Sequence, residues 1–315
     1  MTETTGERLP PVPAVVAAEQ FAREGEVAVG TPPPEIPGRK GRLRRLIVYA
    51  ILFCVALLFF IPFFWDVTTS LKTLPETAGF HLWPKHPSFK AYDNALTTFN
   101  FKRYFANSFF IATVVTLMNL FLSSLGGYAF ARLRFPGREV LFFFVLATLM
   151  IPNELRLVPV FQMLTDMPLV HWHLIGTYQS YFIINLVGAA NLFLMRQYFL
   201  TIPKDYEEAA KLDGAGYFKT YWRVMLPLAG PALAAVTILT FQGTWNDFFW
   251  PLIVFLGNED IFTLPLGILK FKSEFNTQWP ELMAASVIAI LPITILYVFF
   301  QRYFVAGVTA AGVKG

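Results

Sequence analysis

Residues 46–65 read LIVYAILFCVALLFFIPFFW and contain no Asp, Glu, Lys or Arg. An α-helix of about 20 apolar residues crosses the ~30 Å hydrocarbon layer of a bilayer. Three more segments of at least this length are also free of charge, namely 108–131, 174–195 and 282–301. Any one of them could be the buried helix of a soluble protein, but four in one chain predict a membrane protein.

Two further apolar segments are interrupted by charge. Residues 140–159 contain Glu154 and Arg156, and residues 224–256 contain Asp247. Counting both as spans predicts an all-α membrane protein with six transmembrane helices and with both termini on the same side. The expected spans are about residues 46–65, 108–131, 140–160, 174–196, 226–256 and 282–302.

The first 38 residues differ in composition from the rest of the chain. They hold seven prolines among Glu, Thr and Gly, and they have no long apolar run. Such a segment cannot bury enough apolar surface to fold. We therefore expect a disordered tail over residues 1–38 and a six-span domain over residues 39–315. The tail lacks the apolar core and small-residue cleavage site of a signal peptide.

Lys and Arg gather in the segments that would lie on one side of such a domain. Five basic residues between 39 and 45 directly precede the first span. Cytoplasmic segments of membrane proteins carry this excess, whereas the basic residues in the long loop 73–107 fall on the other side. We expect the tail, the C-terminus and the loop around Glu208 to be cytoplasmic. The segments on that side are 39–45, 132–138, 196–223 and 302–314.

The composition excludes a soluble globular domain and a nucleic-acid-binding protein. Charged residues make up 15% of the chain, against about 25% in soluble domains. The net charge of +4 reflects the basic segments beside the spans, and none of them alternates with aromatic residues as in a nucleic-acid groove. The single cysteine, Cys54, lies in the first span, so no disulfide framework exists.

A polar stretch, residues 203–216 with the sequence PKDYEEAAKLDGAG, lies between two apolar segments. Pro203 suits a first helical turn, and the acidic residues after it suit a helix N-terminus. Gly214 can take the positive φ that ends a helix. A second short helix over 217–226 would lead to Pro227 and back to the membrane. The stretch predicts a helix–turn–helix that protrudes from the membrane and suits the docking of a partner.

The segment Glu208-Ala-Ala-Lys-Leu-Asp-Gly214, followed by Leu226-Pro227, resembles the EAA loop of the permease subunits of bacterial ABC importers. Segments elsewhere in the chain are similar to the six-span member of the maltose-type permease pair. They are residues 62–72, 103–108, 127–137, 196–199, 245–248 and 309–315.

The resemblance implies a type I permease bundle in the cell membrane of a bacterium or archaeon, which imports a sugar. Its implied partners are membrane lipid, a second homologous permease, two cytoplasmic ATPase subunits and an extracytoplasmic solute-binding protein. The EAA helix would seat in a cleft of one ATPase and couple ATP hydrolysis to transport. The implied coupling residues are Glu208, Ala209, Ala210, Asp213, Gly214, Leu226 and Pro227.

The chain carries no sequence of its own for ATP hydrolysis, because it lacks the GxxxxGK[ST] pattern of a P-loop. We expect a transport subunit rather than an enzyme, with no bound cofactor and with ATP and Mg on the partner ATPases. His171 and His173 are too few to hold a metal, and no catalytic set can be placed on one rigid element. We therefore expect neither a metal nor a catalytic site.

Polar residues inside the predicted spans are candidates for solute contacts, because burying them in a bilayer is costly. A side-chain amide can both donate to and accept from sugar hydroxyls, but hydrogen bonds between helices use the same chemistry. For Asp247 a structural role is favoured over contact with the solute. The candidates for a substrate pathway are Asn119, Asn185, Asn191, Gln242 and Asn246.

Two other functions remain open at this point. An ion-coupled secondary transporter would be expected to carry carboxylates in the membrane and often repeats, and this chain offers few such carboxylates and no visible repeat. A membrane scaffold without a transport role would also explain the docking loop. The sequence does not identify which sugar or related solute is carried.

Overall fold

The computed structural model describes residues 39–97, 100–166, 173–272 and 277–312. Within these ranges every regular element is a helix, which confirms the predicted all-α class. The chain divides into two units that meet between Ile61 and Pro62. The expected tail, residues 1–38, lies outside the described residues.

The first unit contains most of helix α2 (Arg39–Ser70). Every side chain from Arg42 to Ile61 is exposed, including Phe59 at 71% and Leu46 at 65%. A helix with this composition needs lipid or another protein around it, because water would otherwise contact its apolar side chains.

Three of the described helices are long and apolar enough to cross a membrane without a break. They are α2, α4 (Phe101–Arg132) and α15 (Trp279–Gly312). The number of spans rises to six if each of three sharply bent helix pairs counts as one span. The six spans expected from the sequence therefore remain a prediction.

Three of the predicted spans fall on these bent pairs, so each is made of two helices rather than one. In the first pair, α5 and η2 (Arg138–Met150) meet η3 and α6 (Asn153–Thr165) at a bend of 101°. In the second pair, α7 (Tyr178–Ile184) meets α8 (Ala189–Thr201) at 46°. In the third pair, the segment from α10 through α11 (Tyr217–Leu228) meets α12 (Gly230–Trp245) at 78°. Pro152 lies at the first bend and Gly188 at the second. The expected span 226–256 also ends early, because α12 stops at Trp245 and α13 starts a new helix.

Shorter helices connect these elements. They are η1 (Leu74–Ala78), α3 (Lys90–Thr97), α9 (Asp205–Leu212), the π-helical turn η4 (Tyr221–Met225), α13 (Phe249–Val254), η5 (Glu259–Ile261) and α14 (Leu264–Leu269).

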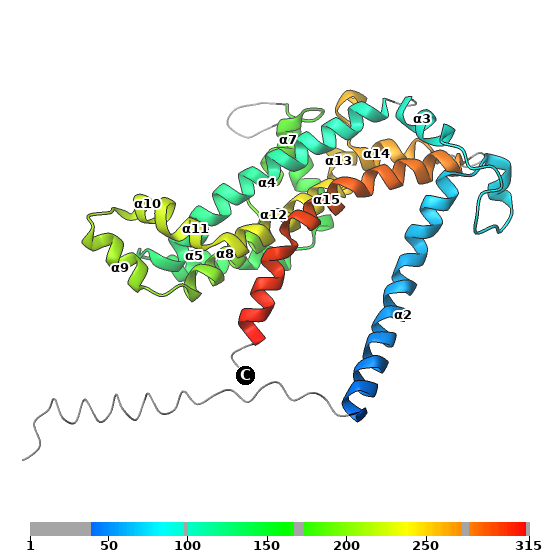
Figure 1. The fold of residues 1–315 in the computed structure, drawn as a ribbon. Coiled ribbons are helices and arrows are strands. Elements are labelled where there is room, and N and C mark those ends of the chain that lie inside the picture. Colours follow the sequence, from blue (N-terminus) through cyan, green and yellow to red (C-terminus); the bar gives the residue numbers. More distant parts are fainter. Residues whose placement is uncertain (1–38, 98–99, 167–172, 273–276, 313–315) are drawn as a thin grey trace, which may run out of the picture. The chain divides into compact units, whose positions relative to one another are not determined.

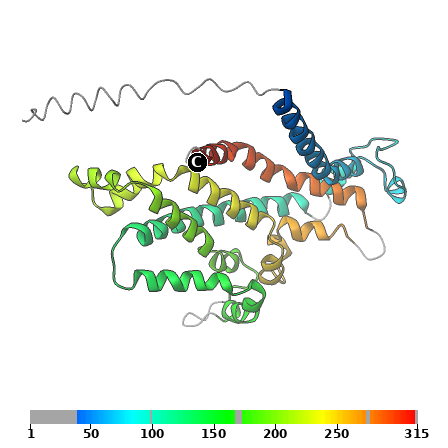
Figure 2. The same cartoon turned by 90° about the horizontal axis from the view of Figure 1, so that it is seen from below.

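Helix α4 is the centre of the second unit and packs against both α8 and α12. Figures 1 and 2 show it running from the end where α3 lies to the end where α9 and α10 lie. Gly127 permits the close approach of α8, because a Cβ built on it would lie 2.6 Å from Met195 Cβ. Small residues allow such contacts between membrane helices. One helix therefore connects the two ends of the unit.

Candidate functional site

The polar stretch and the segment after it fold as a helical hairpin at one end of the second unit, with α9 as its first helix and α10 continued by η4 as its second. Helix α9 starts with three acidic residues in its first turn, where the helix dipole favours them. The chain turns away after the helix at Gly214, which has φ +73°. The Ala215 N–H donates to Ala210 O at 2.9 Å and the Gly214 N–H to Lys211 O at 3.0 Å. This is the Schellman arrangement that closes a helix on a left-handed glycine.

A buried ion pair ties α9 to the end of α4. Arg132 Nε lies 3.7 Å from Glu207 Oε1, and the two side chains are 5% and 12% exposed. Arg132 also donates through Nη2 to the backbone carbonyls of Phe199 and Ile202. One guanidinium therefore holds together the end of α4, the end of α8 and the start of α9. The neighbouring residue Glu208 is exposed.

A second contact holds the other helix of the hairpin. The Tyr221 hydroxyl lies 2.7 Å from Ser124 Oγ on α4, and Tyr221 is 1% exposed. Its ring packs beside Tyr128, with ring centroids 5.4 Å apart. Met225 is fully buried in the same cluster. These contacts make the hairpin an extension of α4 rather than a loose loop.

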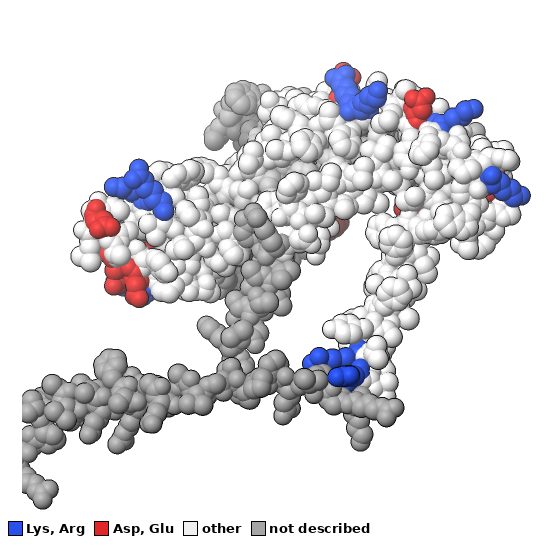
Figure 3. Space-filling model, in the orientation of Figure 1, with Lys and Arg blue, Asp and Glu red and all other residues white. Residues whose placement is uncertain are grey.

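The outer surface of the hairpin is left uncovered. Leu212 is 90% exposed, and Tyr217, Phe218 and Trp222 are 63%, 65% and 51% exposed. Figure 3 shows acidic and basic side chains gathered at this same end of the molecule. Exposed apolar patches bordered by charge mark protein interaction sites. Of the predicted coupling residues, Glu208, Ala209, Asp213, Gly214 and Pro227 are exposed, Leu226 is half-buried and Ala210 is buried.

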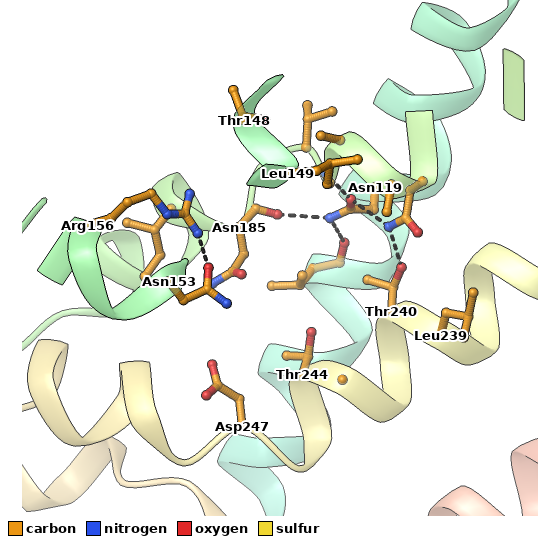
Figure 4. Close-up of a pocket in the computed structure, with 18 of the residues that line it drawn as sticks. Asn119, Thr148, Leu149, Asn153, Arg156, Asn185, Leu239, Thr240, Thr244 and Asp247 are labelled. Carbon is orange, nitrogen blue, oxygen red and sulfur yellow. Dashed lines mark hydrogen bonds between the residues drawn. The ribbon is translucent and has the colours of Figure 1, made fainter. Parts of the chain in front are cut away.

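A cavity of about 700 Å³ lies beside α4, at the break between α7 and α8. Its wall also includes residues from α12 and from the bend between η2 and η3 (Figure 4). Three of the asparagines predicted for a substrate pathway line it together, namely Asn119, Asn185 and Asn191. Gln242 and Asn246 are exposed and are not among its lining residues.

Asn119 bridges the helix break with its own side chain. Its Nδ2 donates to Asn185 O at 2.9 Å, and its Oδ1 accepts from the Gly188 N–H at 2.7 Å. A broken membrane helix leaves such backbone groups unpaired, and neighbouring side chains must satisfy them. The same Oδ1 accepts from Asn191 Nδ2 at 3.1 Å, and Asn191 Nδ2 also donates to Thr240 Oγ1 at 2.8 Å. Asn119 is 3% exposed and is therefore part of the scaffold of the cavity.

Other polar atoms on the wall face the cavity with fewer partners. Asn185 and Asn191 each donate hydrogen bonds through their amide N–H groups. Within the described residues, the Oδ1 of neither side chain accepts a hydrogen bond. Arg156 donates to Asn153 Oδ1, while its Nε is buried without a partner in the described part of the chain. Asp247 accepts from the Tyr181 hydroxyl at 2.7 Å. The wall thus combines amide acceptors with a guanidinium.

A second cavity of about 420 Å³ adjoins the first. Both are lined by Asn153, Arg156, Asn185 and Asp247, among others. The sequence does not single out Arg156 as a site residue, and it favours a structural role for Asp247. The charge inside an otherwise apolar segment was the available signal for both.

Within the described ranges, no three His, Cys, Asp or Glu side chains are placed to hold a metal ion. His171, one of the pair weighed as ligands, lies outside the described residues. His173 Nδ1 lies 2.8 Å from Thr165 O, in a contact to the backbone.

Comparison with known proteins identifies the family. Residues 123–310 match the model of the binding-protein-dependent transport system inner membrane component. The chain belongs to this family of ABC transporter permeases. The match includes the hairpin and most of the cavity wall, though not Asn119, and it confirms the resemblance drawn from the EAA-like loop.

Named relatives cover most of the chain. It is 40% identical over 233 residues to the arabinooligosaccharides transport system permease protein AraQ of Halalkalibacterium halodurans, covering 73% of this chain and 81% of that protein. It is 34% identical to the trehalose/maltose transport system permease protein MalG of Thermococcus litoralis, covering 86% and 96%. A solved bacterial ABC transporter involved in the import of the acidic polysaccharide alginate matches with a TM-score of 0.74 and 27% identity, covering 86% of this chain and all of that one.

Proposed function

We propose that this chain is the membrane-spanning permease subunit of an ATP-driven importer that moves a sugar, of oligosaccharide or disaccharide type, into a bacterial or archaeal cell. The relatives named for sugar transport support the solute class. The partners are a second homologous permease, two cytoplasmic ATPase subunits that carry ATP and Mg, and an extracytoplasmic solute-binding protein. Membership of the family disfavours an ion-coupled transporter and a membrane scaffold without a transport role.

The observation that carries this proposal is that one helix, α4, holds both candidate sites. Arg132 and Ser124 fix the hairpin to α4, and Asn119 fixes the helix break at the cavity. Asn119 and Arg132 are 13 residues apart, or about 20 Å along a helix at ~1.5 Å per residue. A movement of the hairpin would therefore be transmitted to the cavity through the single helix α4.

The uncovered surface of the hairpin is the docking site for the ATPase. The exposed apolar residues would fill a cleft, and Glu208 would pair with a basic group or backbone donors of the partner. Removing one partner of a buried charge contact at an interface costs about 2–5 kcal/mol. The solute would pass through the cavity, where the Oδ1 atoms of Asn185 and Asn191 can accept hydrogen bonds from sugar hydroxyls.

Charge reversal at the hairpin tests the coupling. Glu208→Lys should leave insertion and folding intact, because the Glu208 side chain is exposed, but it should abolish co-purification of the ATPase or solute uptake. Asp93→Lys is the matched control, because Asp93 is exposed on α3 at the other end of the unit. Wild-type uptake by Glu208→Lys at equal expression would refute this assignment of the hairpin.

The basic segments place both termini and the hairpin in the cytoplasm in this proposal. In a chain with Cys54 replaced by Ser, a membrane-impermeant thiol reagent applied to intact cells should label Lys85→Cys. The same reagent should leave Asp205→Cys unlabelled until the cells are opened. Labelling of Asp205→Cys in intact cells would reverse the proposed orientation.

A further inference from the structure

A further, smaller pocket shares no lining residue with either of the two adjoining cavities. Its volume is about 220 Å³. It is formed where α2 ends, where η1 turns and where α15 begins. Its lining residues are Trp65, Thr69, Lys72, Thr77, Gly79, Trp279 and Met283.

Lys72 brings a buried positive charge to this pocket. The residue is only 3% exposed. Its Nζ donates to His81 O at 2.5 Å and lies 4.4 Å from the centroid of the Trp65 ring. In the described part of the chain no carboxylate lies within ion-pair distance of this ammonium group. Burial lowers the pKa of Lys72, and the carboxylate of Glu76 acts in the opposite direction.

This arrangement leaves the charge of Lys72 only partly compensated. An ammonium group has three N–H donors, and within the described residues one carbonyl accepts from this one. An aromatic face adds a modest attraction. Burying a charge without a counter-charge is costly, so an anion in the pocket would complete the site.

Thr69 supplies a second polar group. It is 4% exposed, and its Oγ1 is buried without a hydrogen-bond partner in the described residues. It precedes Lys72 by three residues, and both residues line the pocket. A hydroxyl without a hydrogen-bond partner and an ammonium group with one carbonyl acceptor line one small pocket in the described part of the chain, and together they are suited to an oxyanion.

The surroundings of the pocket match the edge of a bilayer. Two helices long enough to span the membrane meet it with their ends, and each contributes a tryptophan. Tryptophan is enriched at the level of the lipid headgroups. The adjoining loop exposes Phe80 at 82% and Trp83 at 68%, and their rings contact Trp65 and Phe64 at the end of α2.

We propose that the pocket around Lys72 and Thr69 binds the phosphate group of a membrane phospholipid. Lys72 would supply the charge and Thr69 a hydrogen bond, while the tryptophans and the exposed aromatic loop would border the glycerol and acyl parts. The outer leaflet is assigned from the orientation given under the proposed function. The binding itself does not depend on solute or ATPase.

Native mass spectrometry of the full-length chain in detergent tests this proposal. The probes are short-chain phosphatidylglycerol, diacylglycerol with the same chains, inorganic phosphate and glucuronate. The variants are Lys72→Met and Thr69→Val. Lys85→Met is the matched control, because Lys85 is an exposed lysine of the same loop. Gel filtration and circular dichroism confirm that each variant is folded.

We expect Lys72→Met to weaken phosphatidylglycerol binding about tenfold, the effect of losing one hydrogen bond to a charged group. Thr69→Val should weaken it less, and Lys85→Met should leave it unchanged. Thr69→Val decides the matter if Lys72→Met does not fold. Equal binding to wild type and both pocket variants, or equal binding of diacylglycerol, would overturn the proposal.

The other two probes separate the sources of an anion. Inorganic phosphate that binds as tightly as the lipid would show a free-ion site, and glucuronate that displaces the lipid would show a solute site; either result refutes a lipid site. Loss of lipid binding with normal uptake would leave the transport function untouched. Loss of uptake in Glu208→Lys with normal lipid binding would leave the pocket untouched.

Discussion

The hairpin and the cavity are built in opposite ways, although α4 supports both. In the hairpin, the turn at Gly214 is made by residues close together in the chain, and its bonds join positions three and five apart. At the cavity, the helix break is held by Asn119, which is 66 and 69 residues from its partners Asn185 and Gly188. Local bonds leave a readable pattern in the sequence, whereas distant ones do not.

The difference also separates what each region must do. The hairpin leaves its outer surface uncovered, which suits a part that meets another protein. The polar atoms of the cavity wall face inward, and the amide nitrogen and oxygen of Asn119 each bond a backbone group at the helix break. Substitutions in the two regions should therefore have different effects on folding and on transport.

The largest effect on folding is expected at the buried ion pair that ties the hairpin to α4. Arg132→Met leaves the Glu207 carboxylate buried without a counter-charge, and breaking one side of a buried pair costs about 3–5 kcal/mol. Arg134→Met is the control, because Arg134 is exposed two residues further along the chain. Thermal unfolding in detergent measures both variants.

Replacing both members of the pair sharpens this test. Arg132→Met combined with Glu207→Leu removes the isolated charge, and a buried ion pair can often be exchanged for apolar residues at little cost. We expect the double variant to recover at least half of the lost stability. If Arg132→Met alone unfolds like wild type, the hairpin is held by its local bonds and by the contact of Tyr221 with Ser124, and the role given to the ion pair is wrong.

A somewhat smaller effect is expected at the cavity. Asn119→Leu removes the partners of the Gly188 N–H and the Asn185 carbonyl, and each unsatisfied buried group costs about 1–3 kcal/mol. Two such groups sum to about 2–6 kcal/mol, and water that enters the cavity should bring the loss below the one expected at Arg132. Asn246→Leu is the matched control because Asn246 is exposed. Equal stability of the two variants would mean that the break needs no bridge.

These residues also show how far sequence alone could reach. The uncharged segments predicted α2, α4 and α15, because length and composition are local properties. They did not predict that residues 174–196 break at Gly188, since no proline or charge marks that break. Asn119 and Asn191 could be selected as costly polar residues, but not their partners.

The same limit applies to the hairpin. Its helices and its turn followed from the acidic first turn and from Gly214. Glu207 and Arg132 lie 75 residues apart in the chain, and Glu207 is indistinguishable by sequence from its exposed neighbour Glu208. The family pattern drew attention to Glu208, whereas the fold buries Glu207 against Arg132.

The smallest effect is expected where the contribution is purely local. Gly214 has φ +73°, and no atom lies within 4 Å of a Cβ built on it. Gly214→Ala therefore meets no steric obstacle, and its cost is the left-handed backbone alone, about 1 kcal/mol.

Gly216→Ala is the matched control. Gly216 has φ −75° and equally open surroundings, so alanine there should be neutral or slightly stabilising. Thermal unfolding should therefore show Gly214→Ala to be less stable than Gly216→Ala by about 1 kcal/mol. Equal unfolding would show that the turn can relax, and the helix end at Gly214 would then contribute nothing to holding the docking surface in place.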